Sequence, residues 1–330
     1  MRLLWALPPA FTFALAACLG GSGGESPAGT VIGTPAEIPG EPGLVLYRDS
    51  LEGAFIAADP GGSGQWRLAA APGLEAILLA DCTPDGRRLA YVVADPATNI
   101  STFYIQGEEP LSPVEVEGLV QSVAWSPDGS RIALARLDAE TFENHLLLLD
   151  PASGDLQELP SGEDSPGPPR WSPDGERITF SAIGENGSDI YVLRLGDEAP
   201  ARLDREEFAF DPDWSPDGES LIFSASAGER AYQLFTMNSD GGGERQLTMT
   251  DTLKSYPRWS ADGSHIGYAG TVFVNVPSVS ITAASKHLVG VWVARSDGSD
   301  ERLLTDLAQD ARFLGWCAQG EWLEQGWEPL

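Results

Sequence analysis

The stretch Trp171-Ser172-Pro173-Asp174-Gly175 decides the fold, because the chain repeats it with little change. Full copies also begin at Trp125, Trp214 and Trp259, the last with Ala in place of Pro. Weaker copies flank the series, one starting at Cys82 and one at Trp316. The final glycines of successive copies are 43, 46, 43, 45 and 57 residues apart. A period of this size indicates six copies of one supersecondary unit.

The chemistry of the motif predicts a hairpin turn. Proline restricts the residue before it to extended geometry, so a strand ends at Trp171-Ser172. Ser, Pro and Gly at the first, second and fourth positions suit a type I turn that ends in a left-handed residue. An alternating apolar run follows, as in Arg177-Ile178-Thr179-Phe180-Ser181, and a third and a short fourth strand can be read at 189–193 and 201–203. Each repeat therefore contains four strands.

The predicted fold is all-β, a six-bladed β-propeller of four-stranded blades. We find no apolar pattern of helical period within the repeats. The chain enters the repeats with a second-strand sequence at 44–47 and leaves with an unpaired first strand at 311–316. We expect the carboxyl-terminal strand to join the first blade, which closes the ring and leaves no long free sheet edge.

These repeats, with their Phe-Ser second strands and the aromatic third strand Asp189-Ile190-Tyr191, resemble the TolB-type propeller. The resemblance covers residues 43–330 and is specific for fold. It is less specific for function, because similar repeats occur in non-catalytic envelope proteins, in propellers of prolyl-oligopeptidase-like enzymes and in some polysaccharide lyases. We expect the roughly 25 residues after Cys18 to hold no counterpart of the α/β domain that precedes the propeller in TolB, and we expect no hydrolase domain after the propeller. A role in the Tol–Pal system is therefore not implied.

The amino-terminal sequence predicts export and lipid attachment. Residues 3–17 are apolar but shorter than the ~20 residues that span a membrane, which is typical of a signal peptide. The run ends in Leu15-Ala16-Ala17-Cys18, which resembles the lipobox of bacterial lipoproteins and implies acylation of Cys18. The alternative is an ordinary signal peptide cut near Ala17. We expect residues 1–17 to be the signal peptide, 18–42 a Gly/Pro-rich tether and 43–330 the propeller.

The charge of the chain restricts its partners. Asp and Glu number 49 against 20 Lys and Arg, a formal net charge of −29. Such a protein repels nucleic acid and anionic lipid, so we expect membrane contact only through the amino-terminal lipid. Acidic residues gather in loops that a propeller places on one face: Asp138, Glu140, Glu143, Glu163, Asp164, Glu206, Glu207, Asp211, Asp306 and Asp310. This face is either a solvated surface or a docking surface for a cationic partner or Ca²⁺.

The motif tryptophans and aspartates are read as structural residues. Trp125, Trp171, Trp214, Trp259 and Trp316 recur with the turn, which favours a wedge between blades over a ligand-stacking ring. The turn aspartates suit bonds to their own backbone better than a metal ring. The histidines, His145, His265 and His287, lack metal-ligand spacing. We therefore assign no catalytic residue, no cofactor and no metal site.

Two further features concern the closure of the propeller ring and a contact with a partner protein. Cys82 and Cys317 belong to inner strands that ring closure makes neighbours, so a disulfide between them is one interpretation and two buried thiols the other. The last repeat carries a longer connection between its second and third strands, at about 270–288, which we expect to form an extended hairpin and to contact a partner.

These observations favour a lipid-anchored, monomeric envelope propeller, facing the periplasm or the outside, that binds or assembles proteins without catalysis. The alternative is a propeller enzyme acting on carbohydrate or peptide, or a cation-binding protein, with its site where the ring centre meets the acidic face.

Overall fold

The computed structural model describes fourteen segments of the chain, and all their regular elements are β-strands. The segments are 44–48, 55–58, 65–68, 77–95, 97–107, 111–162, 165–184, 187–203, 208–228, 232–250, 252–275, 285–305, 312–317 and 327–329. No helix in them is long and apolar enough to cross a membrane. The expected signal peptide and tether lie outside the described residues.

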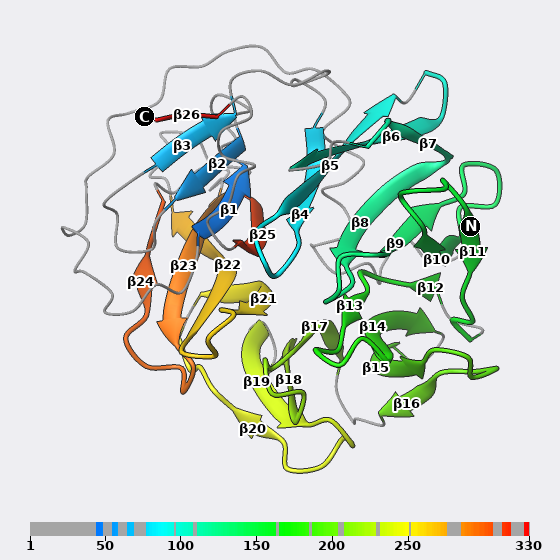
Figure 1. Cartoon of the computed structure of the whole chain (residues 1–330). Coiled ribbons are helices and arrows are strands. Elements are labelled where there is room, and N and C mark those ends of the chain that lie inside the picture. The colour runs from blue at the N-terminus through cyan, green and yellow to red at the C-terminus, as the bar shows by residue number, and fades with distance from the viewer. Residues whose placement is uncertain are drawn as a thin grey trace. The chain divides into compact units, whose positions relative to one another are not determined.

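The strands form six antiparallel sheets that follow one another around a ring (Figure 1). Blade 1 contains β1 (Leu44–Arg48), β2 (Phe55–Ala58), β3 (Gln65–Leu68), β25 (Arg312–Cys317) and β26 (Trp327–Pro329). Blade 2 contains β4 (Ile77–Cys82), β5 (Arg88–Asp95), β6 (Ile100–Gly107) and β7 (Val114–Glu117), and blade 3 contains β8 (Leu119–Trp125), β9 (Ile132–Leu137), β10 (Asn144–Leu149) and β11 (Leu156–Glu158). Blade 4 contains β12 (Ser165–Pro166), β13 (Arg170–Trp171), β14 (Arg177–Gly184), β15 (Gly187–Arg194) and β16 (Ala201–Leu203). Blade 5 contains β17 (Ala209–Trp214), β18 (Ser220–Ser226), β19 (Tyr232–Asn238) and β20 (Arg245–Gln246), and blade 6 contains β21 (Leu253–Trp259), β22 (His265–Asn275), β23 (Ser285–Arg295) and β24 (Arg302–Leu303). The predicted six-bladed propeller is confirmed.

Blade 1 closes the ring as the sequence predicted. The carboxyl-terminal strand β25 pairs with the first strand β1 in antiparallel register, with Val45 opposite Trp316. Beyond the prediction, β26 adds a fifth strand to this sheet, with Glu328 opposite Arg67 on β3. The sequence after Gly320 carries no copy of the repeat, so periodicity gave no signal for this strand.

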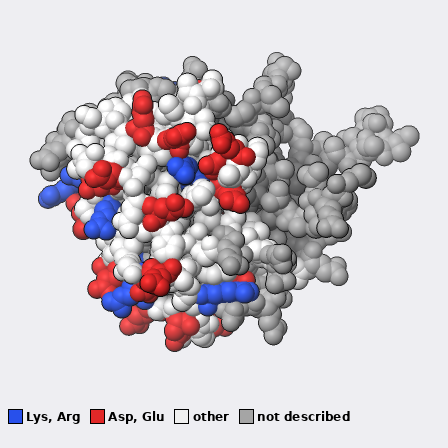
Figure 2. Space-filling view, turned by 90° about the vertical axis from the view of Figure 1, so that its right-hand side faces the viewer, with Lys and Arg blue, Asp and Glu red and all other residues white. Residues whose placement is uncertain are grey.

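The outermost strand of every blade is short and carries a charged residue. These strands are β7, β11, β16, β20, β24 and β26, and they contain Glu115 and Glu117, Glu158, Arg202, Arg245, Arg302 and Glu328 respectively. Figure 2 shows Asp and Glu in excess over Lys and Arg on one side of the propeller. Short, charged edges resist pairing with strands of other molecules.

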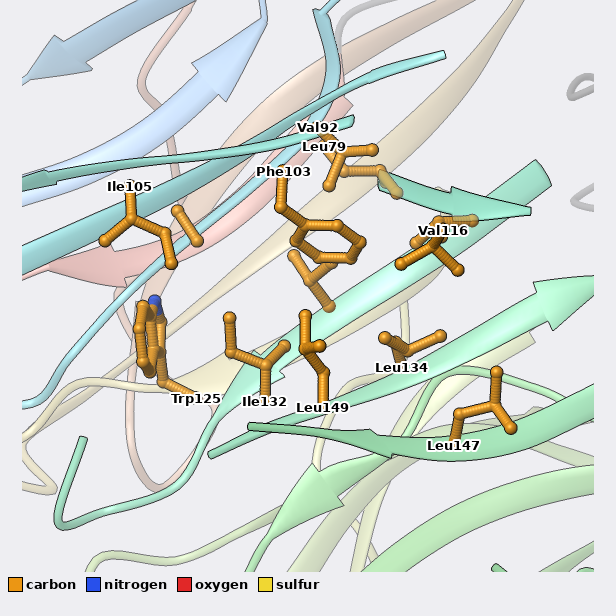
Figure 3. Packing of buried hydrophobic residues seen from close by; sticks show 13 residues of the cluster. Leu79, Val92, Phe103, Ile105, Val116, Trp125, Ile132, Leu134, Leu147 and Leu149 are labelled. Atoms are coloured by element: carbon orange, nitrogen blue, oxygen red, sulfur yellow. The ribbon is translucent and has the colours of Figure 1, made fainter. Parts of the chain in front are cut away.

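The core lies between the blades, where each motif tryptophan contacts the blade before its own. Trp125 packs with Phe103 and Ile105 of blade 2 and with Ile132 of blade 3 (Figure 3). Its indole N–H donates to the Asp81 carbonyl of blade 2 at 3.2 Å. The same bond joins Trp171 to Ala124 at 3.1 Å and Trp316 to Arg258 at 3.1 Å. These three tryptophans thus supply both apolar contact and a polar anchor across an interface, whereas the indole N–H groups of Trp214 and Trp259 are buried without a hydrogen-bond partner.

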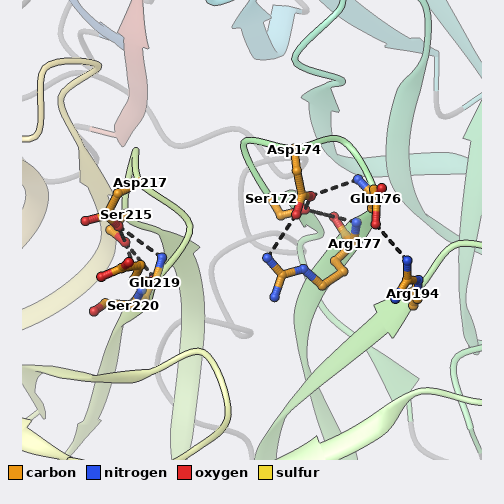
Figure 4. Close-up of polar contacts among 9 residues, drawn as sticks. All are labelled: Ser172, Asp174, Glu176, Arg177, Arg194, Ser215, Asp217, Glu219 and Ser220. Atoms are coloured by element: carbon orange, nitrogen blue, oxygen red, sulfur yellow. Dashed lines mark hydrogen bonds and ion pairs between the residues drawn. The ribbon is translucent and has the colours of Figure 1, made fainter.

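The motif turn is fastened by its own side chains (Figure 4). In blade 4 the Ser172 hydroxyl accepts the Arg177 N–H at 2.9 Å and donates to the Asp174 carboxylate. Asp174 Oδ1 accepts the Glu176 N–H at 2.9 Å, and the Gly175 N–H donates to the Ser172 carbonyl at 2.9 Å. Gly175 has φ of +69°, which L side chains rarely adopt. Equivalent bonds form at Thr83, Ser126, Ser215 and Ser260.

Successive turns also pack on one another. A Cβ added at Gly218 would lie 3.5 Å from Pro173 Cδ of the preceding turn, and one at Gly129 would lie 3.1 Å from Thr83 Cγ2. The Arg177 guanidinium lies 4.4 Å from the ring centroid of Trp214 in the next blade. The proline and glycine of the motif therefore shape the turn and fit it to its neighbour.

The expected hairpin in the last repeat is present. β22 and β23 pair over eleven positions, from His265 opposite Arg295 to Asn275 opposite Ser285. Residues 276–284 between them lie outside the described part of the chain.

Candidate functional site

Charged side chains gather where the inner strands meet. The penultimate residue of the inner strand is charged in four blades. These residues are Asp81 in blade 2, Arg170 in blade 4, Asp213 in blade 5 and Arg258 in blade 6. Their charges act on one another across these blades. Blades that are not neighbours approach each other only at the centre of the ring (Figure 1). We call Asp81, Arg170, Asp211, Asp213 and Arg258 the axial cluster.

The aspartates of the axial cluster bond one blade to the next. Asp81 Oδ2 accepts the Trp125 N–H at 2.8 Å, and Asp213 Oδ2 accepts the Trp259 N–H at 3.0 Å. Burial raises the pKa of Asp81, although Arg170 and Arg258 act against the rise. Burial likewise raises the pKa of Asp213, with the same two arginines in opposition.

The arginines of the axial cluster bond mainly to carbonyl groups. Arg170 Nη1 donates to the carbonyls of Val123 at 3.0 Å and Pro169 at 2.9 Å, and Arg258 Nη1 to Pro257 at 2.7 Å. Burial and the nearby Arg258 lower the pKa of Arg170 to about 10, against the attraction of the aspartates. The two guanidiniums thus offset the charge of two of the three carboxylates, and the bonds of the cluster join one blade to the next.

The face of the ring opposite to the motif turns carries loops with exposed apolar side chains. Phe142 is 75% exposed, Phe208 49% and Met249 81%. All three belong to connections between second and third strands or between fourth and first strands, which share one face of the ring. We call this the loop face.

Asp138 fixes the backbone of the loop that carries Phe142. Its Oδ1 accepts the N–H groups of Glu140 at 2.8 Å and Thr141 at 3.0 Å, and its carbonyl accepts the Phe142 N–H at 2.9 Å. Phe142 itself has φ of +59°, an uncommon geometry for a bulky residue. The loop therefore presents one aromatic ring amid carboxylates.

Phe208 is fixed in place although half of it is exposed. Its ring stacks with Phe210 at 6.4 Å between centroids, and Phe210 meets Tyr232 edge-on at 5.7 Å. Gly187 of blade 4 lies so close that a Cβ there would be 2.7 Å from Phe208 Cε1. The Phe208 carbonyl accepts the Ser226 N–H at 3.1 Å. Such a preorganised ring loses little entropy on binding.

A buried cation also lies near this face but is already paired. Lys254 Nζ is 3.1 Å from Glu301 Oε1 and donates to Thr250 Oγ1 at 2.6 Å. Tyr268 donates its hydroxyl to the same Glu301 oxygen at 2.6 Å. This lysine therefore does not offset the acidity of the loop face.

The candidate lipid-attachment, acidic and histidine residues of the sequence analysis lie partly within and partly outside the described segments. Cys18 lies outside the described residues, as do Glu163, Asp164, Glu206, Glu207, Asp306 and Asp310. His145 Nδ1 is 2.8 Å from Glu158, and His265 Nδ1 is 2.7 Å from the Ser264 hydroxyl. His287 is described only as backbone of β23. Within the described segments no group of three or more His, Cys, Asp or Glu could hold a metal ion. Ca²⁺ as a ligand of the acidic loops stays a prediction.

Asp211 corrects one sequence interpretation. It was grouped with the acidic loops, but it lies in the inner strand β17 and is only 6% exposed. A bulge between Phe210 and Asp213 gives it φ of +53° and lets it accept the Tyr256 N–H of blade 6 at 3.2 Å. Sequence reasoning missed the axial cluster, although charges directly before the motif were a usable signal.

Cys82, the last residue of β4, is buried and takes part in a disulfide. Its sulfur lies 3.4 Å from the Trp316 carbonyl oxygen. Cys317 follows Trp316 as the last residue of β25, and its side chain lies outside the described residues. The pairing of Cys82 with Cys317 stays a prediction.

Comparison with known proteins agrees with this geometry. The family model described as the TolB beta propeller domain matches residues 88–310. The chain belongs to this family. The Tol-Pal system protein TolB of Anaeromyxobacter dehalogenans (strain 2CP-C) is 30% identical over 130 residues, which are 39% of this chain and 29% of that protein. The match thus spans less than a third of that relative.

Solved TolB structures share the propeller fold. TolB from Acinetobacter baumannii has a TM-score of 0.64 at 19% identity and covers 84% of this chain and 68% of its own. The putative TolB from Agrobacterium tumefaciens has a TM-score of 0.57 at 20% identity, with 80% and 91% coverage. These identities show the fold of a TolB-type propeller and nothing finer.

We expect Cys82 and Cys317 to form the disulfide that latches blade 2 to blade 1. Thiol titration of the denatured, unreduced protein should then find neither of them free, and reduction should lower the free energy of unfolding by about 2–5 kcal/mol. The Cys82→Ser variant is the control, because reduction should not change its stability. Two free thiols besides Cys18 in the unreduced protein would contradict the pairing.

Proposed function

We propose that this protein is a lipid-anchored envelope propeller that binds another protein through its loop face, without catalysis. Membership of the TolB propeller family supports an envelope binding role, since the similar protein of Anaeromyxobacter dehalogenans is named as a Tol-Pal system protein. The proposal places the propeller in the periplasm or outside the cell, as a monomer, because a net charge of −29 disfavours self-association.

The observation that carries the proposal is the exposure of Phe142 and Phe208 on acidic loops. Exposed aromatic rings, Phe included, are enriched at protein interfaces and serve there as anchors. Asp138, Glu140 and Glu143 border Phe142 and favour a partner whose apolar socket is rimmed by Lys and Arg. The loops thus combine an anchor with electrostatic selection of the partner.

The anchoring part of the proposal rests on the amino-terminal sequence. Leu15-Ala16-Ala17-Cys18 supplies the attachment site, and a Gly/Pro-rich tether at 18–42 would let the acidic propeller stand away from anionic lipid. Two or more acyl chains give stable membrane attachment, where a single chain is marginal.

We expect Phe142→Ala and Phe208→Ala each to weaken the partner complex about tenfold or more, because each removes an exposed anchor. Leu156→Ala is the matched control, since Leu156 is 40% exposed but lies on the outermost strand of blade 3. The partner is identified by cross-linking in cells, and its affinity for each purified variant is measured by calorimetry. Equal affinity of all three variants and the wild type would contradict the loop-face assignment.

Cys18→Ala should abolish labelling with an alkyne palmitate and release the protein from the membrane fraction, because it removes the acylated thiol. Cys82→Ser serves as the control and should keep both label and membrane association. Continued labelling of the Cys18→Ala variant would refute lipid attachment at this residue.

A further inference from the structure

The hairpin of blade 6 extends beyond the sheet to which it belongs. β21 pairs with β22 only as far as Leu253 opposite Thr271. The hairpin pairing continues for four more positions, from Val272 opposite Leu288 to Asn275 opposite Ser285. Among the described residues no strand pairs with the edge of β22 at 272–275 that faces away from β23, on the side where β21 pairs earlier in the strand. This edge, which we call the open edge, spans about 13 Å of backbone.

The open edge differs from the other sheet edges of the ring. Every outermost strand is two to four residues long and contains a charged residue, such as Glu115 on β7 or Arg302 on β24. The open edge is Val272-Phe273-Val274-Asn275, with no charge and three residues of high β propensity. An uncharged edge of this composition attracts further strands unless something covers it. Among the described residues no strand pairs with the outer edge of β23 at 285–289 either, but that edge contains Lys286, so the open edge is distinguished by its lack of charge.

We propose that the open edge binds an extended segment of a partner protein by strand addition. The N–H and C=O groups of those alternate residues in 272–275 that face away from β23 would bond to the incoming backbone, and alternate side chains of the segment would contact the faces of the hairpin. The segment would continue the line of β21 beyond Leu253, next to β22.

The charge of the chain decides between a partner strand and a second copy. Two identical edges could pair with each other, but each copy carries a net charge of −29. A segment that alternates apolar residues and carries Lys or Arg is attracted by the same field. The occupant is therefore a basic segment of a different protein.

This inference rests on the proposed function, because it specifies how a partner of the loop face would be held. The hairpin extends from the second-to-third strand connection of blade 6, which belongs to that face. A partner could thus contact the aromatic anchors and the open edge together.

The matched variants are Val272→Lys and Leu288→Lys. Val272 and Leu288 are opposite each other in the hairpin and both are half-buried, but they lie on opposite edges. A lysine at position 272 places a charge on the open edge, whereas one at 288 places the same charge on the other strand. Thermal unfolding should first show that both variants melt within a few degrees of the wild type.

The probe is a library of random peptides displayed on phage and selected against the purified full chain. We expect the selected peptides to alternate apolar residues with Lys or Arg, and to protect from hydrogen exchange those amides of residues 272–275 that face away from β23. Val272→Lys should weaken their binding about tenfold or more, and Leu288→Lys less than about twofold.

Several results would overturn strand addition. These are equal effects of the two variants, absence of amide protection at 272–275, or failure to select any peptide. Sedimentation showing a wild-type dimer that Val272→Lys converts to monomer would assign the edge to a second copy instead. The loop-face variants separate the two proposals: if Phe208→Ala loses the cellular partner and Val272→Lys does not, the proposed function stands and strand addition fails.

Discussion

The hydrogen bond between the motif serine or threonine and the motif aspartate is the interaction on which this propeller depends. In blade 4 it joins Ser172 to Asp174, and both side chains then accept N–H groups of the returning strand. This fixes Gly175 in left-handed geometry against the preceding turn. The turn positions the inner strand, and the inner strand positions the tryptophan that packs against the preceding blade. Local chemistry repeated in sequence thereby becomes a closed ring.

The sequence predicted those parts of the fold that arise from residues close together in the chain. The turn, the four strands of each blade and the closing strand β25 all follow from local pattern, and the structure confirms them. Strand β26 was missed because its pairing with β3 joins residues far apart without a repeat to mark them.

The candidate site was less accessible to sequence reasoning. Asp211 was misplaced because a one-residue bulge in β17 turns an apparent loop acid into an interior bond to blade 6. The axial cluster combines residues from blades 2, 4, 5 and 6, and only ring closure brings them together. The exposure of Phe208 depends on its fit against Gly187 of another blade. The charges directly before the motif mark the residues of the axial cluster, but a single sequence does not show that they converge.

The two faces of the propeller have different roles, one structural and one in binding. The motif turns are nearly identical in every complete repeat, and the axial cluster bonds one blade to the next, so these parts hold the blades together. The loops at the opposite face differ from blade to blade in length, charge and aromatic content. A rigid scaffold with variable loops is the usual arrangement of a binding protein. The open edge of β22 and the ring of Phe208 both belong to this variable part.

The central claim is tested most directly by the pH dependence of unfolding in the wild type and in Asp174→Asn. Partial burial raises the pKa of Asp174, but hydrogen bonds from Ser172, Glu176 and Arg177 lower it overall. A carboxyl group with a lowered folded pKa stabilises the protein above its unfolded pKa, and this stabilisation is lost as the pH falls through the folded value. The wild type should therefore be the more stable protein at pH 7, with the difference shrinking steadily as the pH falls below about 4. A difference that is absent at pH 7, or that stays constant on acidification, would contradict the account.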